Sequence, residues 1–540
     1  MRGARSAKFA ASAIVVVMAA TACGGSGDGG SSSGEADPDG VLSVENGEPQ
    51  NPLQPANVKE QYGSQIIKAV FSQLVKYENG TGKLQMENAE SVESKDNKTW
   101  TIKLKPGWTF HNGEKVTAKS YVDAWNWGAN IDNNQTNSSW FADIKGFEDV
   151  HPEKGDPKSK KMSGLKVVDD NTFTVELNSS NPTFSYKLGY DVWSPLPSVF
   201  YKDPKAAGKK PIGNGPYKLD KWENKKFIKV SRYDKYKGSD KPKNGGIEFK
   251  NYTSLETAYA DLRSGNLDIV RQISPKDLPK YHSDLGDRAI DKPYNATQII
   301  NFAFYTDQWK DIDPKVKQGL SMAIDRETIT KTVLQGSREP STGFVPAGVR
   351  GYQKDACGKY CKYNAKEANK LIKEGGGVPG KKIYIQYNAD QGHKEWVEAV
   401  CNSIRKATKI ECLTDSKPDF QADTKARDAK QVKSMFRGGW VQDYPLNMNF
   451  MTDLYRTGVA GNTGDYSNKK FDALTKEADS ADTVDEVVKA YQKAEKVLVE
   501  DMPGIPLWDY KANTGHSEKV DNVKIDDEGN PIYTGITVTK

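Results

Sequence analysis

Cysteine, histidine and long apolar runs are scarce in this sequence. Only 5 of its 540 residues are Cys and 5 are His, which argues against a metal-rich protein. A chain of this length buries several cores, so folding needs no disulfide scaffold. The 77 Lys and Arg nearly balance the 72 Asp and Glu, and a net charge of +5 is too small for a dedicated nucleic-acid binder. What is left is a large globular protein, because 11 Trp, 25 Tyr and 17 Phe supply apolar surface for cores.

Recognisable catalytic motifs are also missing. The sequence has no HExxH, no phosphate-binding P-loop and no Cys2His2 spacing. Segments 25–30 and 30–34 formally match GxGxxG and GxSxG, but both lie in a Gly/Ser-rich stretch with no strand before them or helix after them. We therefore expect no cofactor, no metal and no enzymatic activity.

The longest apolar run stands at the N-terminus. Three basic residues precede Phe9–Ala20, which is too short to span a bilayer, and Thr21-Ala22-Cys23 follows. This is the layout of an export signal. The Ala-Thr-Ala-Cys ending resembles a bacterial lipobox, in which Cys23 would receive a diacylglyceryl group. The alternative is an ordinary signal peptide that is cleaved elsewhere, with Cys23 incidental.

We accordingly expect a signal peptide over 1–22 and a flexible Gly/Ser tether over 23–36. Removing 1–22 takes away three basic and no acidic residues, which lowers the net charge from +5 to +2. No later segment has about 18 consecutive apolar residues, so we expect no transmembrane helix. The folded part would lie outside the cytoplasmic membrane, held at its outer face by the lipid anchor.

Four cysteines remain after Cys23, and an even number in an oxidising compartment indicates disulfides. Three pairings are possible. We favour the local ones, Cys357 with Cys361 and Cys401 with Cys412, because a helix over 395–406 followed by a strand would bring the second pair together. A metal site is the alternative, although CxxxC without a neighbouring His pair is a poor zinc pattern.

Helical and strand patterns alternate along the chain, which predicts an α/β fold with parallel or mixed sheets. The expected strands include 100–104, 172–177, 227–231, 247–251, 267–270 and 382–387. The expected helices include 120–127, 255–263, 316–323, 327–334, 365–373 and 483–500.

Six short motifs occur in a fixed order from about residue 41 to the C-terminus. The first is Asn51-Pro52-Leu53. The second lies within 97–125 and combines Phe-His-Asn-Gly with Val-Thr-Ala. The other four are the segments 213–219, 262–268, 323–326 and 439–445. In this order they resemble the oligopeptide/dipeptide-binding group of extracytoplasmic solute-binding proteins of ABC importers. Ser120 departs from the pattern, because relatives have Asp at that position.

The resemblance implies a two-lobed fold of the type II periplasmic-binding-protein kind with an extra α/β domain. Its lobes would close around the ligand at hinge crossings near 295–304 and 504–512. The implied domains are domain I (37–72, 194–295 and 507–540), domain II (73–193) and domain III (296–506).

The motif at 439–445 carries the expected ligand site. By resemblance, Asp443 pairs with the N-terminal amine of a peptide. Gly439 and Val441 offer main-chain hydrogen bonds to the peptide backbone, and Trp440 forms a flat wall. The structural alternatives are a surface carboxylate or helix cap for Asp443 and core packing for Trp440.

Two further residues complete the expected site. Arg437 stands three residues before the Trp, where a basic side chain meets a ligand carboxylate or balances the charge of the site. Trp140 would reach the cleft from domain II.

The implied function is capture of oligopeptides by a monomer that delivers them to the permease subunits of an ABC importer. A same-fold alternative is a receptor for an oligosaccharide, a nickel complex or an opine, and a neutral sugar would not need Asp443. An alternative of another class is a secreted, lipid-anchored hydrolase.

Overall fold

The fold is taken from a computed structural model that describes residues 35–540. The expected signal peptide and Cys23 lie outside the described residues, as does nearly all of the expected tether. Strand β1 (Ala36–Asp37) begins at the last residue of that tether and pairs with the C-terminal strand β20 (Thr537–Thr539). Across residues 35–540, no helix combines the length and apolarity that a membrane crossing requires.

An 11-stranded mixed sheet forms the framework of the molecule, with the strand order β16-β15-β17-β13-β18-β12-β2-β11-β10-β9 and β14 paired to β18. Its strands are β2 (Val41–Asn46), β9 (Tyr217–Glu223), β10 (Phe227–Arg232), β11 (Gly246–Asn251), β12 (Ile269–Val270), β13 (Ala289–Phe302), β14 (Arg338–Pro340), β15 (Lys382–Asn388), β16 (Glu411–Lys417), β17 (Met435–Val441) and β18 (Gly504–His516).

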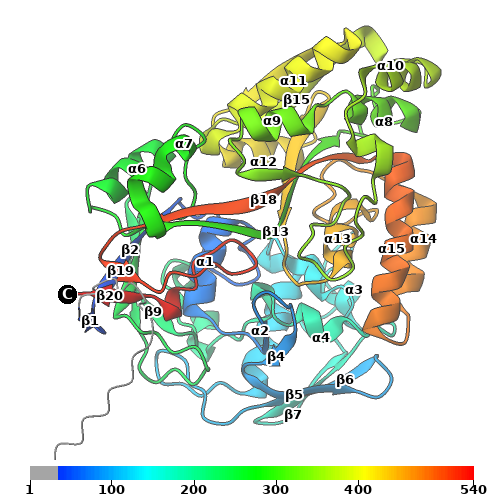
Figure 1. Cartoon of the computed structure of the whole chain (residues 1–540). Coiled ribbons are helices and arrows are strands. Elements are labelled where there is room, and N and C mark those ends of the chain that lie inside the picture. The colour runs from blue at the N-terminus through cyan, green and yellow to red at the C-terminus, as the bar shows by residue number, and fades with distance from the viewer. Residues whose placement is uncertain (1–34) are drawn as a thin grey trace, which may run out of the picture.

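Two long antiparallel strands, β13 and β18, join the two halves of this sheet. On one side β18 continues through β12 to β2, and on the other β13 pairs with β17. Figure 1 shows β13 and β18 running side by side between the region of β2 and the region of α9 and α11. The predicted hinge crossings near 295–304 and 504–512 fall on these two strands.

A separate four-stranded sheet has the order β5-β6-β8-β7, and every pairing in it is antiparallel. Its strands are β5 (Ala89–Ser94), β6 (Thr99–Leu104), β7 (Leu165–Asp169) and β8 (Thr172–Glu176). The prediction of parallel or mixed sheets is wrong for this part, because helix α2 (Ala118–Ala129) lies between β6 and β8 in sequence without making them parallel. Smaller pairings join β3 (Val75–Tyr77) to β4 (Leu84–Met86), and β20 to β19 (Val520–Asp521).

Most predicted helices are confirmed to within a few residues. The longest, α15 (Val484–Asp501), starts at a capping box in which Thr483 and Glu486 bond each other's backbone N–H groups. The other helices are α1 (Gln61–Val70), α3 (Phe147–Val150), α4 (Phe184–Lys187), α5 (Pro204–Ala207), α6 (Leu255–Arg263), α7 (Leu278–Leu285), α8 (Pro314–Met322), α9 (Arg326–Thr332), α10 (Ala365–Glu374), α11 (Lys394–Thr408), α12 (Phe420–Asp428), α13 (Thr452–Tyr455) and α14 (Lys469–Asp479).

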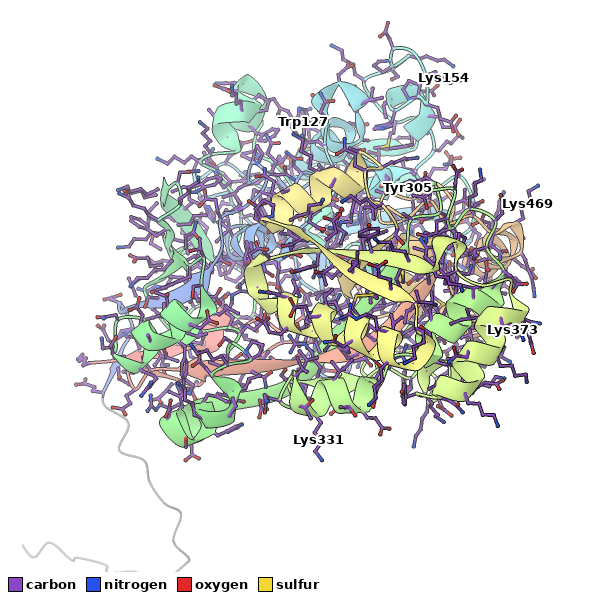
Figure 2. The ribbon with its side chains drawn as sticks, turned by 90° about the horizontal axis from the view of Figure 1, so that it is seen from above. Trp127, Lys154, Tyr305, Lys331, Lys373 and Lys469 are labelled. Atoms are coloured by element: carbon purple, nitrogen blue, oxygen red, sulfur yellow. A yellow bond between two sulfur atoms is a disulfide. The ribbon has the colours of Figure 1, made fainter. Side chains whose placement is uncertain are left out.

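Buried apolar side chains form two large cores. One is built from residues between 42 and 269 with two C-terminal additions, Val520 and Ile536, and the other from residues between 299 and 508. Trp140 is partly buried and packs against both. Lysines cover much of the outside, and Lys331, Lys373 and Lys469 extend away from the body in Figure 2. These charged side chains face solvent, so charged groups that are buried between the two cores are exceptions.

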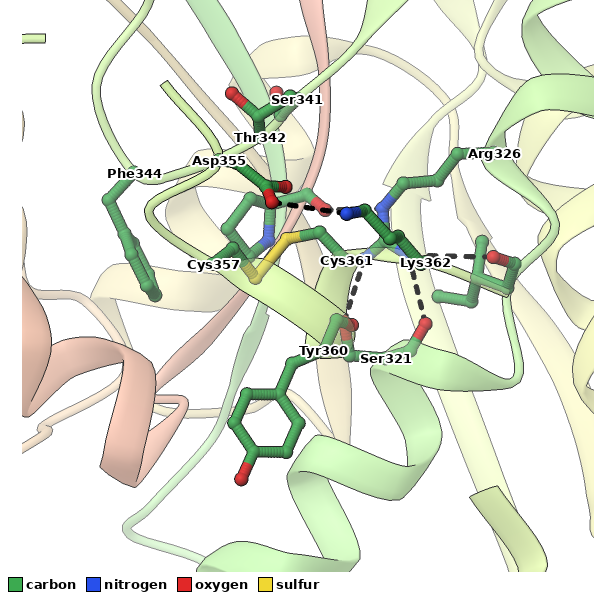
Figure 3. Close-up of a disulfide and its surroundings, with 12 residues drawn as sticks. Ser321, Arg326, Ser341, Thr342, Phe344, Asp355, Cys357, Tyr360, Cys361 and Lys362 are labelled. Carbon is green, nitrogen blue, oxygen red and sulfur yellow. Dashed lines mark hydrogen bonds and ion pairs between the residues drawn. A yellow bond between two sulfur atoms is a disulfide. The ribbon is translucent and has the colours of Figure 1, made fainter. Parts of the chain in front are cut away.

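Both disulfides have the favoured pairing. Cys401 on α11 is bonded to Cys412 on β16, and both are fully buried, so the bridge ties the helix to the strand it covers. Cys357 is bonded to Cys361 around a short helical turn (Figure 3). The Tyr360 carbonyl in that turn accepts a 2.7 Å hydrogen bond from Ser321 of α8, which fixes the turn to the neighbouring helix.

Removing the Cys401–Cys412 bridge by a double substitution to Ala should lower the free energy of unfolding by about 3 kcal/mol, since the bridge closes a short loop in the unfolded chain. The same change at Cys357 and Cys361, which closes a smaller loop, should cost about 2 kcal/mol. Urea unfolding without reductant measures both. A Cys401–Cys412 variant as stable as the oxidised wild type would contradict this.

Candidate functional site

A cavity of about 530 Å³ lies between the two cores. Its volume is within the range of about 300–1,000 Å³ that ligand pockets occupy. The lining comes from α1, the segment 136–143, β13, β17 and the loop after β19. All six residues predicted to bind ligand line it: Trp140, Arg437, Gly439, Trp440, Val441 and Asp443. The structure thus brings them together, while their contact with a ligand stays a prediction.

Strand β17 offers a free edge to this cavity. Along one side it pairs with β13 over its whole length, from Met435 to Val441. Along the other side β15 pairs with it only at Met435 and Phe436. The rest of that edge, 437–441, therefore has no neighbouring strand among the described residues. Gly439 is exposed there, and an extended ligand can add to such an edge through its main chain.

Asn449 organises the end of this strand. Its Nδ2 donates to Asp443 Oδ2 at 2.8 Å and to Asp453 Oδ2 at 2.7 Å. Its Oδ1 accepts from the Asp443 N–H at 2.8 Å and from Trp440 Nε1 at 3.2 Å. This fully buried amide thus fixes the indole and both carboxylates at once.

The carboxylate of Asp443 has no cationic partner among residues 35–540. Burial raises its pKa well above the ordinary value, and the neighbouring charge of Asp453 raises it further. Burial also raises the pKa of Asp453 to about 6, although Lys187 opposes that shift. No ion pair between the described residues includes Asp443, because Lys68 contacts Glu528 instead. A positively charged ligand group would supply the missing charge.

The opposite end of the free edge is cationic. Arg437 donates to Asn388 Oδ1 at 3.1 Å, while its Nε–H has no partner among the described residues. His393 lines the cavity nearby, and its pKa falls well below the ordinary value because it is buried and faces Arg437 and Arg338. Its Nδ1 accepts from Trp396 Nε1 at 3.0 Å, so the ring proton of neutral His393 is on Nε2, where it has no partner. These unpaired donors suit an anionic group.

Aromatic side chains form the wall near Asp443. Trp140 stacks on Tyr190 with ring centroids 4.4 Å apart and meets the edge of Tyr444 at 6.0 Å. Tyr444 belongs to the second core, Tyr190 packs against the first, and Trp140 lies between them and packs against both. The aromatic contact therefore bridges the two sides of the cavity.

Polar contacts join the parts of the chain that carry the two cores, and one of them, between Lys59 and Asp428, lies in the lining of the cavity. Arg350 donates to the Tyr186 hydroxyl at 3.2 Å, and Asn97 donates to the Asp482 carbonyl at 2.8 Å. Lys59 lies 3.7 Å from Asp428. Each pair joins a residue within 42–269 to one within 299–508, so these two parts of the chain are in direct contact.

Several site residues have no signal in the sequence. Asn449 and Asp453 follow the recognised motif without belonging to it, and His393 is one of five scattered histidines. Asp453 and His393 line the cavity and Asn449 lies buried behind it, and these positions depend on how β13, β17 and α11 pack. A search for polar residues shortly after the motif would have found Asn449, but nothing local identifies His393.

Known proteins share this sequence pattern and this architecture. The profile of the family described as bacterial extracellular solute-binding proteins, family 5 Middle, matches residues 83–462. The oligopeptide-binding protein OppA of Bacillus subtilis is 25% identical over 518 residues, which are 92% of this chain and 93% of the relative.

Solved structures with less than 25% identity agree in fold. Haemophilus influenzae OppA in complex with the peptide RPPGFSPFR is 24% identical and superposes with a TM-score of 0.82 over 94% of this chain and 100% of that chain. Escherichia coli MppA, a murein tripeptide binding protein, is 22% identical with a TM-score of 0.83 over 93% of this chain and 98% of its own. Its unliganded open form reaches only 0.70, with 22% identity and coverage of 94% and 99%. The two-lobed architecture is thereby confirmed, and the chain superposes less closely on the open form of MppA than on the other MppA structure.

Replacing Asn449 with Ala should lower the free energy of unfolding by about 2 kcal/mol, because it leaves the buried Asp443 N–H and the Trp440 indole without an acceptor. Urea unfolding measures the loss. Asn402→Ala, on the exposed side of α11, is the control and should change stability by less than about 0.5 kcal/mol. Equal effects of the two substitutions would refute this role of Asn449.

Proposed function

Because the chain belongs to the bacterial extracellular solute-binding proteins of family 5, we propose that it captures short peptides between its lobes and delivers them to an ABC importer. One observation carries the proposal: Asp443, a carboxylate with no ion-pair partner among the described residues, stands at the end of a free strand edge that lines the cavity. A peptide has an ammonium group and a backbone that match both features. The relatives named for oligopeptide binding support the same class of ligand.

The proposed peptide lies extended along 437–441. Its ammonium group binds Asp443, its backbone pairs with Gly439 and Val441, and its carboxylate points toward Arg437 and His393. From residue 437 to residue 443 an extended strand spans about 20 Å. With side chains reaching inward at both ends, this length suits a peptide of about three to five residues. Side-chain selectivity is weak in such a scheme, since the main chain and the termini supply most of the contacts.

Binding is proposed to be coupled to closure of the lobes about β13 and β18. The contacts of Arg350, Asn97 and Lys59 join the two parts of the chain that carry the two cores. A ligand that touches both sides binds the closed form more tightly than an open form. This difference in affinity stabilises the closed form. The division into domain I (37–72, 194–295 and 507–540), domain II (73–193) and domain III (296–506) is part of this proposal.

Export and anchoring complete the proposal. The N-terminal pattern supports removal of 1–22, lipidation of Cys23 and attachment to the outer face of the cytoplasmic membrane. The monomer would then present its closed, liganded form to the permease subunits and perform no chemistry itself. A receptor for a neutral sugar would use the aromatic wall but not Asp443, so the experiments turn on that residue.

Calorimetry with tri- to pentapeptides tests the role of Asp443. Acetylation of the peptide amine, or Asp443→Asn in the protein, should each weaken binding by about 10- to 100-fold, the value of a charge-assisted hydrogen bond in a buried site. Because Asn has nearly the same size and shape as Asp, this substitution removes the charge without changing the shape of the site. If acetylation leaves the affinity unchanged, the assignment of Asp443 is wrong, and if no peptide binds, the proposed class of ligand is wrong.

Peptide binding should also release a proton and weaken in acid. The raised pKa of Asp443 in the free protein falls when a ligand ammonium group binds, because the cation favours the ionised carboxylate. Affinity is therefore full above the free-protein pKa and declines as the pH falls through it toward the lower pKa of the complex. Calorimetry in buffers of different protonation enthalpy counts the proton. Asp443→Asn should abolish the share of the proton release that comes from Asp443. If the variant releases as many protons as the wild type, another group is the source.

A further inference from the structure

Two tyrosines separate the ligand cavity from a second cavity. The second cavity has a volume of about 230 Å³, and Tyr294 and Tyr510 are the residues whose side chains appear in the lining of both cavities. Their ring centroids are 5.7 Å apart and their planes are tilted by 51°. The two rings thus stand next to each other as a partition.

A break in the pairing of β13 and β18 produces this partition. Pro293 pairs with Lys511 and Thr297 pairs with Asp509, so the three residues 294–296 lie opposite the single residue Tyr510. Such a bulge re-aims the side chains of the longer strand. Here it brings Tyr294 against Tyr510 at the junction of the two cavities.

The two rings are held in different ways. Tyr510 donates its hydroxyl to Gln298 Oε1 at 2.6 Å, and the guanidinium of Arg338 lies 4.1 Å from its ring centroid. Tyr294 lies against Gly529, where an added Cβ would come within 2.9 Å of its ring. No hydrogen bond between the described residues uses the Tyr294 hydroxyl. Tyr294 is therefore held by shape alone and can be truncated with little loss of polar contacts.

The partition stands beside Asp443, the amine end of the proposed ligand site. Asn295, next to Tyr294, accepts the Gln442 N–H at 2.9 Å and donates to Gln442 Oε1 at 2.9 Å. Gly529, on which Tyr294 rests, follows Glu528, whose charge raises the pKa of Asp443. The Asn295–Gln442 hydrogen bonds and the contact with Gly529 both place the rings next to the position of the ligand ammonium group.

The second cavity does not itself offer unpaired charges of both signs to a ligand. Lys292 pairs with Asp527 at 3.2 Å and Lys511 with Glu339 at 2.7 Å. Its remaining carboxylate, Asp509, accepts a 2.6 Å hydrogen bond from Ser341. Most of its charged groups are thus paired or hydrogen-bonded within the wall of the cavity. What the second cavity offers is therefore space, which the two tyrosines close off from the ligand cavity.

We infer that Tyr294 and Tyr510 form a specificity-determining wall, which ends the ligand cavity at Asp443 and excludes ligands that carry a substituent on the amine. The inference rests on the proposed function, in which the ammonium group binds Asp443. A carboxylate attracts a secondary ammonium group almost as well as a primary one, so charge alone does not reject substituted amines. A steric wall does reject them, and exclusion of the wrong ligand is a separate requirement from attraction of the right one.

The test compares trialanine with N-benzyl-trialanine, which keeps the ammonium charge and replaces one of its three N–H hydrogens with a bulky benzyl group. Calorimetry on the wild-type protein should show the benzyl peptide binding at least about 30-fold more weakly. Tyr294→Ala should improve the affinity for the benzyl peptide, relative to the affinity for trialanine, by about tenfold or more. The opened space is large enough, since a cavity of about 150 Å³ already holds a benzene ring. Tyr294→Phe keeps the ring and should behave as wild type.

Each outcome decides the inference. Equal binding of both peptides by the wild type overturns it. So does a Tyr294→Ala protein that melts like the wild type, binds trialanine and still rejects the benzyl peptide. If Tyr294→Ala does not fold, Tyr510→Ala opens the same partition from the other strand and must give the tenfold gain. If neither trialanine nor a pool of tri- to pentapeptides binds the wild type, the proposed function itself fails, which is a distinguishable result.

Discussion

The pairing of β13 with β18 is the constraint on which the rest of the structure depends. These strands belong to both halves of the large sheet, and the second core begins at Ile299 on β13 and ends at Trp508 on β18. The free edge of β17 is placed by its register against β13. Even the break in the pairing has an effect, because it turns Tyr294 toward the cavity. One ladder of backbone hydrogen bonds therefore sets both the framework and the shape of the site.

Electrostatics gives the cavity its polarity. Burial of Asp443 beside Asp453 is unfavourable in the free protein, as the raised pKa values of both groups indicate. Burial of Arg437 and His393 with unpaired donors is unfavourable at the other end. These costs are tolerated because Asn449 and Asn388 fix the groups without neutralising them. An extended zwitterion relieves both ends at once, whereas a neutral molecule relieves neither.

Local sequence patterns were sufficient for most elements and for the residues near one motif. The helices over 255–263 and 483–500, the strand over 227–231 and both disulfide pairings follow from periodicity, capping residues and spacing, which act over short distances. The motif at 439–445 identified four of the cavity residues, and Arg437 just before it a fifth, because they share one strand and its end. The antiparallel arrangement of β5 to β8 was not predicted, because register between separated strands is a tertiary property. His393 and Tyr294 were missed for the same reason: each becomes a cavity residue only when distant strands meet.

The free edge of β17 has a consequence for the survival of the folded protein. An unpaired strand edge on a protein surface recruits other chains and starts aggregation. Here the edge at 437–441 lines a cavity together with α1, Trp140 and the loop after β19, instead of lying on an outer surface. A second folded copy of the chain does not fit into a cavity of about 530 Å³, so the position of the edge works against pairing between copies.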